Sequence, residues 1–518
     1  MAQYISSIQA STETETLSTR GITTKVFKGS LWTIIGQVLP LAASLFATHF
    51  VIKILGSEAY GVLILVGLIP SYFNFADFGM GLASTKFASE AYARGSRDGE
   101  GKVIRTAALI AFLTSLPIAA VIFVFSFSIA AWLNVPEHLQ PETSLALKFA
   151  TVTIVLNSLS GIFNTPQLSR LRMDLNTFVT SGFRILGIIT APIVLYLGCG
   201  IAGAVFVIMI ANFLTLICHL FVSGKLLNEL FGLSVDRDII KPLLKFGGAL
   251  AISGIAIILL INLEKLVLAR VSSVEVLAYY SVAFTFASMA TMFSGSMTQS
   301  LLPAFSQLLR PEKRHELNKL FSRSLRINII GLIPTIMFLF VVAKPFFTIW
   351  AGENFGRESS IPFYILLFGL SFNVIAYIPY IVLLAAGRTD ILAKLSWIEL
   401  FPYILLIAVL TNKFGAVGAA AAWSLRVIIE AGILIWLSKK FVGISLNLFK
   451  GKGYFFALIF LLLIPPILVV FFISNYSVGL VFLVPICIMI YFVIVWKKLL
   501  ETEEKVWISN KMYAIFNR

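Results

Sequence analysis

The sequence predicts an all-α, polytopic membrane protein with fourteen transmembrane helices. The first observation behind this fold class is composition: 58% of the 518 residues are hydrophobic, only 13% are charged, and the mean hydropathy is +0.94. Soluble domains carry charge on roughly a quarter of their residues. The second observation is a series of apolar runs of membrane-spanning length, and the third is the way basic residues alternate between the connections that join these runs.

The apolar runs set the number of helices, since a helix needs about twenty mostly apolar residues to cross a bilayer. Connections such as Gly198 to Gly200 and Asn412 to Phe414 are little more than turns, so no soluble module is predicted. In chain order, the predicted spans are residues 29–53, 60–84, 104–133, 145–168, 176–197, 201–223, 243–268, 275–302, 325–350, 361–386, 391–411, 415–437, 454–473 and 478–496.

Lys and Arg residues gather in every second connection. Positively charged loops stay on the cytoplasmic side of a membrane, so the alternation predicts an inner-membrane protein with both termini in the cytoplasm. The predicted inner connections include Arg20, Lys25, Lys28, Lys86, Arg94, Arg97, Lys102, Arg170, Arg172, Lys225, Arg237, Lys241, Lys245, Arg310, Arg314, Arg388, Lys439 and Lys440, whereas the outer side has only Lys53, Lys148, Lys265, Arg270, Lys344, Arg357 and Lys413.

The chain also repeats itself. A shift of about 218 residues sets Phe87 on Phe305 and Arg105 on Arg323. We therefore expect two pseudo-symmetric six-helix bundles around a central cavity, followed by two extra helices. The predicted domains are a disordered cytoplasmic tail (1–24), an N-lobe (25–224), a cytoplasmic linker (225–242), a C-lobe (243–438), the two appended spans (439–498) and a second cytoplasmic tail (499–518).

A stripe of small and polar residues recurs in the second and eighth spans. Gly67, Ser71, Asn74 and Gly81 share one helix face, and Thr285, Ser288, Met292 and Gln299 follow nearly the same spacing one repeat later, with the second residue at i+3 in place of i+4. Parallel repeats in transporters place the substrate at their interface, so we predict that Gln37, Asn74, Ser288 and Gln299 line the cavity. The alternative is close helix packing, which uses the same residue types.

Other functional classes find little support in the composition. The net charge of +15 follows loop topology rather than one patch, which points to anionic membrane lipid and not to nucleic acid. The three cysteines lie within apolar runs, with no metal-type spacing and no disulfide framework. The sequence contains no Gly-rich phosphate-binding loop of the kind that binds ATP. We predict no cofactor and no metal, and leave a coupling proton, a coupling sodium ion and the membrane potential open.

Several short motifs resemble one family. The run from Gly29 to Thr33, the run from Leu55 to Gly61, Asp77-Phe78-Gly79, and Glu264-Lys265-Leu266 are similar to polysaccharide flippases of the multidrug/oligosaccharidyl-lipid/polysaccharide exporter superfamily. The resemblance implies a flippase that moves an undecaprenyl-diphosphate-linked oligosaccharide to the outer leaflet for O-antigen, capsule or exopolysaccharide, with a polysaccharide polymerase as a possible partner. Glu264 departs from the family, in which Asp is usual.

Such a substrate has two phosphates, so cations within the membrane are candidate ligands; each costs about 2.5–3.5 kcal/mol to insert. We predict that Lys53, Arg184, Lys265 and Arg270 attract the diphosphate. The alternative for Lys53 and Arg270 is snorkelling to the headgroups from helix ends. Arg426 and Glu430 are four residues apart on one helix, and we expect them to neutralise each other.

Four residues are predicted candidates for ion coupling: His49, Asp77, Glu264 and Glu399. His49 is included because an imidazole can accept a proton, but the alternative is a hydrogen-bonded interfacial histidine. Asp77 has an alternative as a helix cap that pairs with Lys86. The carboxylates can each accept a proton.

Three alternative functions stay open. A drug/cation antiporter of the same superfamily would need an acidic cavity, and a peptidoglycan-precursor flippase would share the cationic one. A membrane-embedded polymerase or glycosyltransferase would need a sizeable outer loop, and no predicted outer connection exceeds roughly fifteen residues. The sequence therefore favours a transporter over an enzyme.

Overall fold

The computed structural model describes residues 2–232, 236–291, 294–295, 301–302, 304–306, 308–309, 311–444, 479–499 and 505. Every regular element within these residues is a helix, which confirms the predicted all-α fold class. The chain divides into two compact units, Met1–Ala278 and Tyr279–Arg518.

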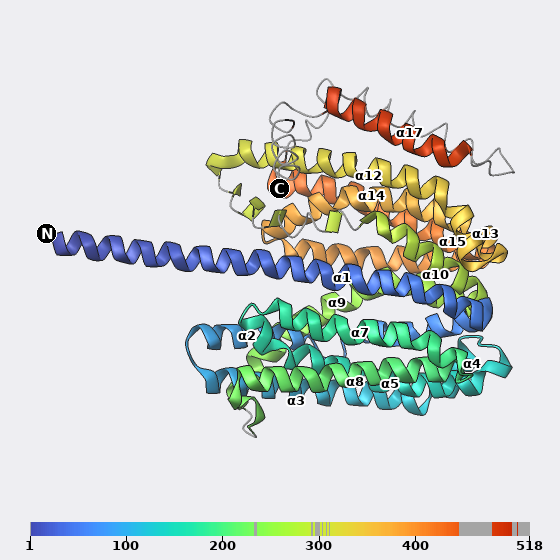
Figure 1. Ribbon diagram of the computed structural model, residues 1–518, viewed down its shortest axis with the longest axis horizontal. Coiled ribbons are helices and arrows are strands. Elements are labelled where there is room, and N and C mark those ends of the chain that lie inside the picture. Colours follow the sequence, from blue (N-terminus) through green and yellow to red (C-terminus); the bar gives the residue numbers. More distant parts are fainter. Residues whose placement is uncertain are drawn as a thin grey trace. The chain divides into compact units, whose positions relative to one another are not determined.

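The first unit is built from long helices joined by short turns (Figure 1). Its core consists of small and branched side chains, with Val62, Ala107 and Ala146 fully buried. The elements are α1 (Ala2–Tyr72), α2 (Met80–Ala93), α3 (Arg97–Val124), α4 (Ser126–Trp132), η1 (Glu137–Leu139), α5 (Gln140–Phe163), α6 (Thr165–Ser169), α7 (Met173–Tyr196), α8 (Gly200–Leu226), η2 (Asn228–Phe231), α9 (Arg237–Val271) and the start of α10 (Val274–Ser288).

The second unit is helical as well. Phe321, Ile378 and Val382 are fully buried between its helices. Its elements are the rest of α10, η3 (Met289–Thr291), η4 (Pro311–Lys313), α12 (Arg314–Ala351), α13 (Glu353–Glu358), α14 (Ser360–Ala385), α15 (Thr389–Leu437), η5 (Ser438–Val442), α17 (Gly479–Ile494) and η6 (Val495–Leu499).

Ten helices of the described chain are long and apolar enough to cross a membrane, so the chain is a multi-pass membrane protein. Two of these helices, α1 and α15, each cover two predicted spans. Each is kinked between its two spans at a glycine with positive φ, Gly56 (φ 75°) in α1 and Gly415 (φ 55°) in α15. Glycine adopts these positive φ values without the steric cost that a Cβ would bring. The predicted span 454–473 lies outside the described residues.

The second predicted span, 60–84, is wrong in its last part. The helix stops at Tyr72, and residues 73–79 form a series of tight turns before α2 begins at Met80. Asp77 directs the break, because its carboxylate accepts hydrogen bonds from the backbone N–H groups of Gly79 and Gly81, each at 2.9 Å. A side chain that satisfies these otherwise unpaired donors replaces the helical hydrogen bonds.

The N-terminal segment also differs from its prediction. Residues 2–24, predicted to be a disordered tail, continue α1 as helix up to Ala2, and Figure 1 shows this end of α1 extending as a single rod. The segment contains no proline, so nothing in it forces an end to the helix that the apolar residues begin.

Helix α9 belongs to the first unit, although the sequence assigns residues 243–268 to the second lobe. It packs on α1 and α2 through a very close approach, since a Cβ on Gly79 would lie 2.3 Å from the carbonyl oxygen of Gly247. Tyr72 adds a hydrogen bond from its hydroxyl to the carbonyl of Asn262 at 2.5 Å. The predicted lobe boundaries at 224 and 243 stay a prediction.

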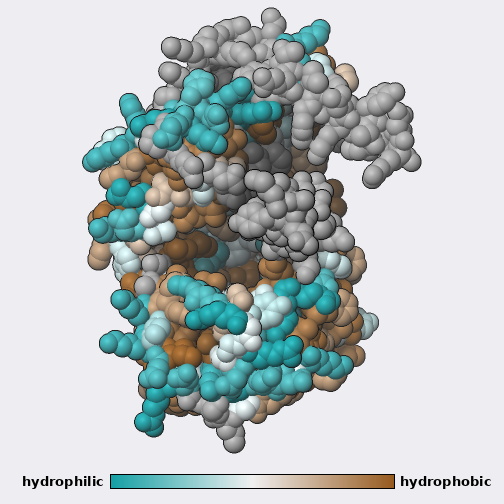
Figure 2. All heavy atoms as spheres, turned by 90° about the vertical axis from the view of Figure 1, so that its left-hand side faces the viewer, coloured by the Kyte–Doolittle hydropathy of each residue, from teal (hydrophilic) through white to brown (hydrophobic). Residues whose placement is uncertain are grey.

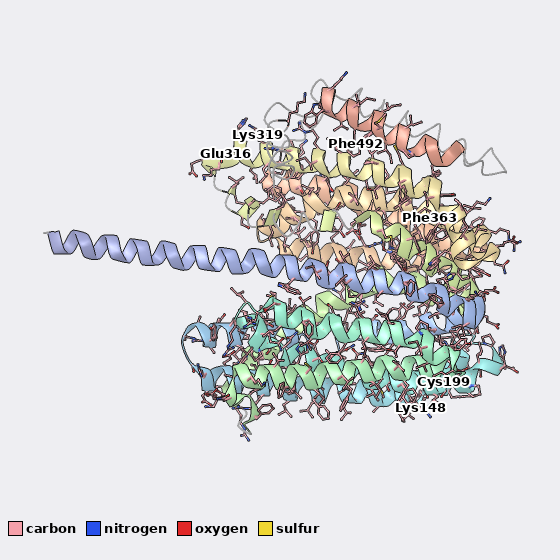
Figure 3. The ribbon with its side chains drawn as sticks, viewed as in Figure 1. Lys148, Cys199, Glu316, Lys319, Phe363 and Phe492 are labelled. Atoms are coloured by element: carbon pink, nitrogen blue, oxygen red, sulfur yellow. The ribbon has the colours of Figure 1, made fainter. Side chains whose placement is uncertain are left out.

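The two ends of the first unit differ in the way that the loop pattern predicts. The connection from α2 to α3 exposes Arg94 and Arg97, and Figure 2 shows hydrophilic side chains gathered over this end. Lys148 and Cys199 lie at the other end of the unit (Figure 3). Residues predicted on opposite sides of the membrane therefore lie at opposite ends, as a spanning bundle requires. Which end faces the cytoplasm stays a prediction.

Candidate functional site

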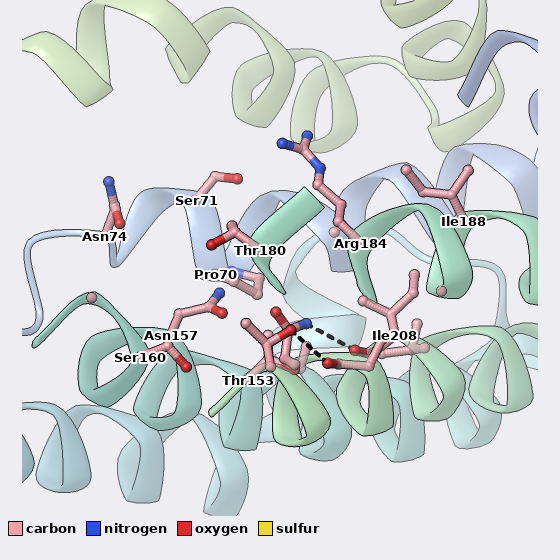
Figure 4. Close-up of a pocket in the computed structure, with 18 of the residues that line it drawn as sticks. Pro70, Ser71, Asn74, Thr153, Asn157, Ser160, Thr180, Arg184, Ile188 and Ile208 are labelled. Carbon is pink, nitrogen blue, oxygen red and sulfur yellow. Dashed lines mark hydrogen bonds between the residues drawn. The ribbon is translucent and has the colours of Figure 1, made fainter. Parts of the chain in front are cut away.

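The first unit encloses a cavity of about 750 Å³ among α1, α5, α7 and α8 (Figure 4). Ligand sites in proteins typically measure 300–1,000 Å³. The cavity wall is dominated by small apolar residues and by uncharged side chains that can form hydrogen bonds. The latter are Ser44, Ser71, Asn74, Thr153, Asn157, Ser160, Asn164, Thr180, Asn212, Thr215 and His219.

Helical spacing produces this wall. On α5 and at its C-terminal end, Thr153, Asn157, Ser160 and Asn164 follow one another by four, three and four residues, so they share one face. The side chains on α8 at Asn212, Thr215 and His219 repeat the pattern. The sequence prediction missed both stripes, although a search for polar residues at helical spacing in the fourth and sixth spans would have found them.

His219 lines one side of the cavity and connects three helices there; it is only 1% exposed. Its Nδ1 lies 3.0 Å from Nε2 of Gln167, and its Nε2 lies 3.2 Å from the hydroxyl of Thr180. Because the Gln167 amide nitrogen only donates, His219 accepts at Nδ1 and carries its hydrogen at Nε2. The same amide nitrogen donates to Ser223 at 3.1 Å. These bonds hold α6, α7 and α8 together beneath the cavity.

Three buried oxygens at this site have no hydrogen-bond partner among the described residues: Ser160 Oγ, Asn164 Oδ1 and Gln167 Oε1. Leaving a buried polar group unsatisfied costs about 1–3 kcal/mol. Ser160 and Asn164 line the cavity directly. Together with the other hydroxyl and amide side chains of the lining, they make the wall suited to a polar, hydrogen-bonding ligand.

Arg184 is the one charged residue that lines the cavity, among the residues the structure describes. Within the described part of the chain it has no carboxylate partner, and no Asp or Glu lines the cavity. In Figure 4 its side chain extends away from Thr153, Asn157 and Ser160, so the guanidinium lies at the margin of the polar surface. A guanidinium donates two parallel hydrogen bonds to a phosphate, and this position leaves those donors available.

The other three predicted cations do not line the cavity. Lys53 is exposed on α1. Arg270, at the end of α9, donates to Asn134 Oδ1 at 2.9 Å and lies over the Trp132 ring at 5.8 Å.

Lys265 is nearly buried and donates to Asn262 Oδ1 at 2.9 Å, beside the carboxylate of Glu264 at 3.9 Å. The partner of Arg270, Asn134, lies 136 residues earlier in the chain, whereas Lys265 is held by its own neighbours on α9.

The predicted coupling residues of the first unit have different partners. Asp77 caps the start of α2, while Lys86, its predicted partner, lies over the ring of Phe246 at 4.3 Å. His49 packs edge-on against Phe50 at 5.1 Å. Glu264 is fully buried next to Lys265.

The remaining candidates are divided between the two units. Asn74 lines the cavity together with Gly67 and Ser71 from the predicted stripe, whereas Gln37 is exposed on α1 away from it. In the second unit, Ser288 donates to the carbonyl of Thr285, and Glu399 lies beside Arg426. Gln299 lies outside the described residues.

Comparison with known proteins decides the family. The family model described as "Polysaccharide biosynthesis protein" matches residues 26–309, more than half of the chain. The chain belongs to the polysaccharide biosynthesis protein family. This confirms the resemblance drawn from its motifs.

Two relatives of this polysaccharide biosynthesis protein extend the match. "Putative O-antigen transporter" of Shigella flexneri is 24% identical over 432 residues, which cover 82% of this chain and 100% of the relative. "Uncharacterized membrane protein EpsK" of Bacillus subtilis (strain 168) is 21% identical over 333 residues, which cover 61% of this chain and 64% of the relative.

Solved structures show the same fold. The lipid II flippase MurJ, in an inward closed conformation, superposes with a TM-score of 0.67 at 15% identity, covering 89% of this chain and 97% of MurJ. An inward-facing multidrug resistance MATE family transporter of the MOP superfamily gives a TM-score of 0.66 at 12% identity, covering 81% of this chain and 99% of that transporter. The family member therefore has the fold of this superfamily.

A shallow, open surface with basic residues lies along the start of α9. Arg237, Lys241 and Lys245 line it at intervals of four residues, with Ile240 and Leu244 between them. The described residues contain no group of three His, Cys, Asp or Glu side chains close enough to hold a metal ion. The chemistry available at the cavity and at this surface is thus hydrogen bonding and anion binding.

Proposed function

We propose that this protein is a flippase that carries a lipid-diphosphate-linked oligosaccharide across the cytoplasmic membrane for surface polysaccharide synthesis. The observation that carries the proposal is the cavity among α1, α5, α7 and α8: about 750 Å³, lined by hydroxyl and amide groups, with one arginine and no carboxylate. The family match and the name of the Shigella flexneri relative support the class of substrate.

The cavity chemistry fits the two polar parts of such a substrate. Sugar hydroxyls both donate and accept hydrogen bonds, as do the side chains of Asn157 and Asn164 that face the cavity. The diphosphate is suited to Arg184, whose fork-shaped guanidinium binds phosphate oxygens in pairs. Arg184 is exposed at the cavity, so its guanidinium can reach an anionic ligand.

The remaining steps of the proposal concern transport. The lipid tail stays in the bilayer while the headgroup occupies the cavity, because the polyprenyl chain is as apolar as the surrounding lipid. The units rock between inward-open and outward-open states, as in other repeat-built transporters. Both chain ends then lie in the cytoplasm, as the basic connections predict.

Binding measurements on the purified full-length protein test this function. Undecaprenyl diphosphate and an undecaprenyl-diphosphate-linked oligosaccharide serve as probes, and native mass spectrometry reports their occupancy. We expect Arg184→Gln to weaken both by roughly tenfold or more, since a charge-assisted hydrogen bond to phosphate contributes about 1.5–3 kcal/mol.

Lys53→Gln is the matched control, since it removes one exposed cation from the same unit and leaves the cavity lining intact. Equal affinity in the wild type and Arg184→Gln would contradict the proposal. A peptidoglycan precursor is the competing probe. Tighter binding of that precursor than of the oligosaccharide lipid would favour a peptidoglycan-precursor flippase instead.

A further inference from the structure

Three charged side chains meet inside the second unit, all on α15. Nη1 of Arg426 lies 3.7 Å from Oε2 of Glu399 and 3.5 Å from Oε2 of Glu430. The side chains of Glu399 and Arg426 are only 7% and 9% exposed, and that of Glu430 is 24% exposed. Two carboxylates thus share one guanidinium in a helix of membrane-spanning length.

The negative charge of the Glu399 carboxylate is poorly compensated by its surroundings. Neither of its carboxylate oxygens accepts a hydrogen bond from the described residues, although both are buried. By comparison, the buried Glu100 of the first unit takes two hydrogen bonds from Arg170, at 2.6 and 3.1 Å. A buried ion pair repays its desolvation only when its geometry is good and its oxygens are satisfied. Glu399 meets neither condition.

The groups around the triad add no second positive charge. Arg426 lies over the rings of Tyr403 at 5.3 Å and Trp423 at 5.8 Å. From α14, Tyr377 and Tyr380 lie close enough to interact electrostatically with Glu430. Phenol and indole groups are neutral at physiological pH. With both carboxylates ionised, the described part of this cluster therefore carries one excess negative charge.

We infer that Glu399, Arg426 and Glu430 form a proton-binding site, and that this site couples proton movement to transport; the coupling, but not the binding, rests on the proposed function. One proton from water forms an O–H bond on a carboxylate oxygen of Glu399. Arg426 and Glu430 remain as a neutral ion pair. Loss of the proton to water on the other side of the membrane restores the starting state.

The same geometry disfavours a metal cation. Hard cations need several oxygen ligands around them, and a guanidinium 3.5–3.7 Å from both carboxylates would repel a sodium ion held between them. A proton needs one oxygen and no surrounding ligand shell. The triad therefore fits a proton better than a metal ion.

The internal sequence repeat allows this charge cluster to be compared, position by position, with the cavity of the first unit. Subtracting the repeat of about 218 residues sets Glu430 on Asn212 and Glu399 on Ser181. Asn212 lines the cavity, and the hydroxyl of Ser181 donates to the carbonyl of Gly36 at 3.0 Å. Neutral residues in the first unit thus stand where the second unit has carboxylates, so the two units are built for different ligands.

Infrared difference spectroscopy of the full-length protein in lipid nanodiscs tests the proton site. Protein labelled with ¹³C-glutamate is compared at alkaline, neutral and weakly acidic pH, a range in which exposed glutamates stay ionised. We expect the C=O band of a protonated glutamate in the wild type. It is lost in Glu399→Gln, and also in Glu430→Gln, because the remaining carboxylate is then matched one to one with Arg426.

Glu58→Gln is the matched control, since Glu58 is an exposed glutamate of the first unit. The band persists in this variant and persists when sodium chloride is added at constant pH. A band that survives in Glu399→Gln, or one that sodium removes, would overturn the proton site. The variant Glu430→Gln keeps the test decisive if Glu399→Gln does not fold.

Proteoliposomes test the coupling. With an oligosaccharide lipid as substrate and a pH-sensitive dye in the lumen, the wild type shows proton movement that depends on substrate, and Glu399→Gln loses it. Undecaprenyl diphosphate binding is measured in parallel and stays within about twofold of the wild type, because Glu399 lies outside the cavity. If the wild type shows the protonated-glutamate band but its substrate binding does not depend on Arg184, the proton site stands and the proposed function is refuted. If binding depends on Arg184 but the band is absent, only the proton site is refuted.

Discussion

Glu100 of the first unit and Glu399 of the second unit are both buried carboxylates that face an arginine, yet their surroundings differ. Glu100 has a partner of its own, Arg170, which also lies over the ring of Tyr92 at 4.5 Å. Glu399 shares Arg426 with Glu430. The first arrangement is electrically complete and stabilises the fold. The second is one positive charge short, which is a property expected of a binding site.

For uncharged polar residues, the difference between the two units is the opposite: here the described part of the first unit has polar groups without partners, and the second unit has a packed apolar core. In the first unit, Ser160 and Asn164 face a cavity, with one oxygen each left without a partner in the described structure. One repeat later in the sequence, these positions are Ile378 and Val382, which are fully buried. Polar groups of this kind are costly in a packed core. The comparison is the reason that we propose ligand recognition in the first unit and proton binding in the second.

The largest expected effect is at the complete ion pair. Glu100→Ala leaves Arg170 without its carboxylate in a mostly buried position, which costs about 3–5 kcal/mol of unfolding free energy. Glu399→Gln keeps the side-chain volume and removes an excess charge, so its cost is below about 1 kcal/mol. Thermal unfolding of both variants in detergent micelles gives the comparison. Equal losses would show that the two carboxylates have the same structural role.

The second-largest effects are expected when residues at equivalent positions of the two repeats are exchanged. Ile378→Ser removes a fully buried apolar side chain from the second unit and leaves a hydroxyl in its place, at a cost of about 2–4 kcal/mol. The reciprocal change, Ser160→Ile, keeps the stability of the protein but blocks the cavity, so it abolishes binding of the oligosaccharide lipid. Unfolding curves and native mass spectrometry distinguish the two results. Retained binding in Ser160→Ile would contradict a ligand role for this wall.

A smaller change in stability is expected when a methyl group is added to a glycine in each unit. A Cβ on Gly369 would lie 2.4 Å from the hydroxyl of Ser424 and 2.6 Å from its Cβ, so Gly369→Ala forces α14 and α15 apart at a cost of about 1–3 kcal/mol. A Cβ on Gly161, which lines the cavity, would meet nothing within 4 Å. Gly161→Ala therefore leaves the melting temperature unchanged or raises it. A loss of stability in Gly161→Ala would show that the cavity is closed by packing.

The smallest effect concerns a single hydrogen-bonding group. Asn157→Ala removes one amide from the cavity wall and should weaken binding of the oligosaccharide lipid by roughly three- to tenfold. Binding of undecaprenyl diphosphate, which has no sugar, should stay unchanged. A matching loss for both probes would mean that Asn157 supports the shape of the cavity and does not contact the glycan.

The sequence supplied a large part of the fold for a simple physical reason. A bilayer demands long apolar helices whose backbone groups are satisfied internally, so hydropathy alone predicts helices such as α5 and α8. Local rules failed where a side chain competed with the helix: the carboxylate of Asp77 ends the predicted span early. A hydropathy pattern contains no information on such a capping bond.

For the candidate sites, the sequence identified individual residues but not their neighbours. Arg184 was predicted from its place within an apolar run, and it lines the cavity. Arg270 was predicted from its place at the outer end of the seventh span, about one repeat after Lys53, but Asn134, 136 residues earlier in the chain, binds its guanidinium. The pair of Arg426 and Glu430 follows from helical spacing, whereas the approach of Glu399 depends on the bend of α15 at Gly415.

By itself, then, the sequence determined most of the helices and the family, because apolar length and short motifs are local properties. Only the tertiary structure decided that Gln167, Thr180 and His219 form one network beneath a cavity. It also decided that two carboxylates share one arginine. These relations depend on distances between helices far apart in sequence, and each side chain gains its role from partners that no local pattern specifies.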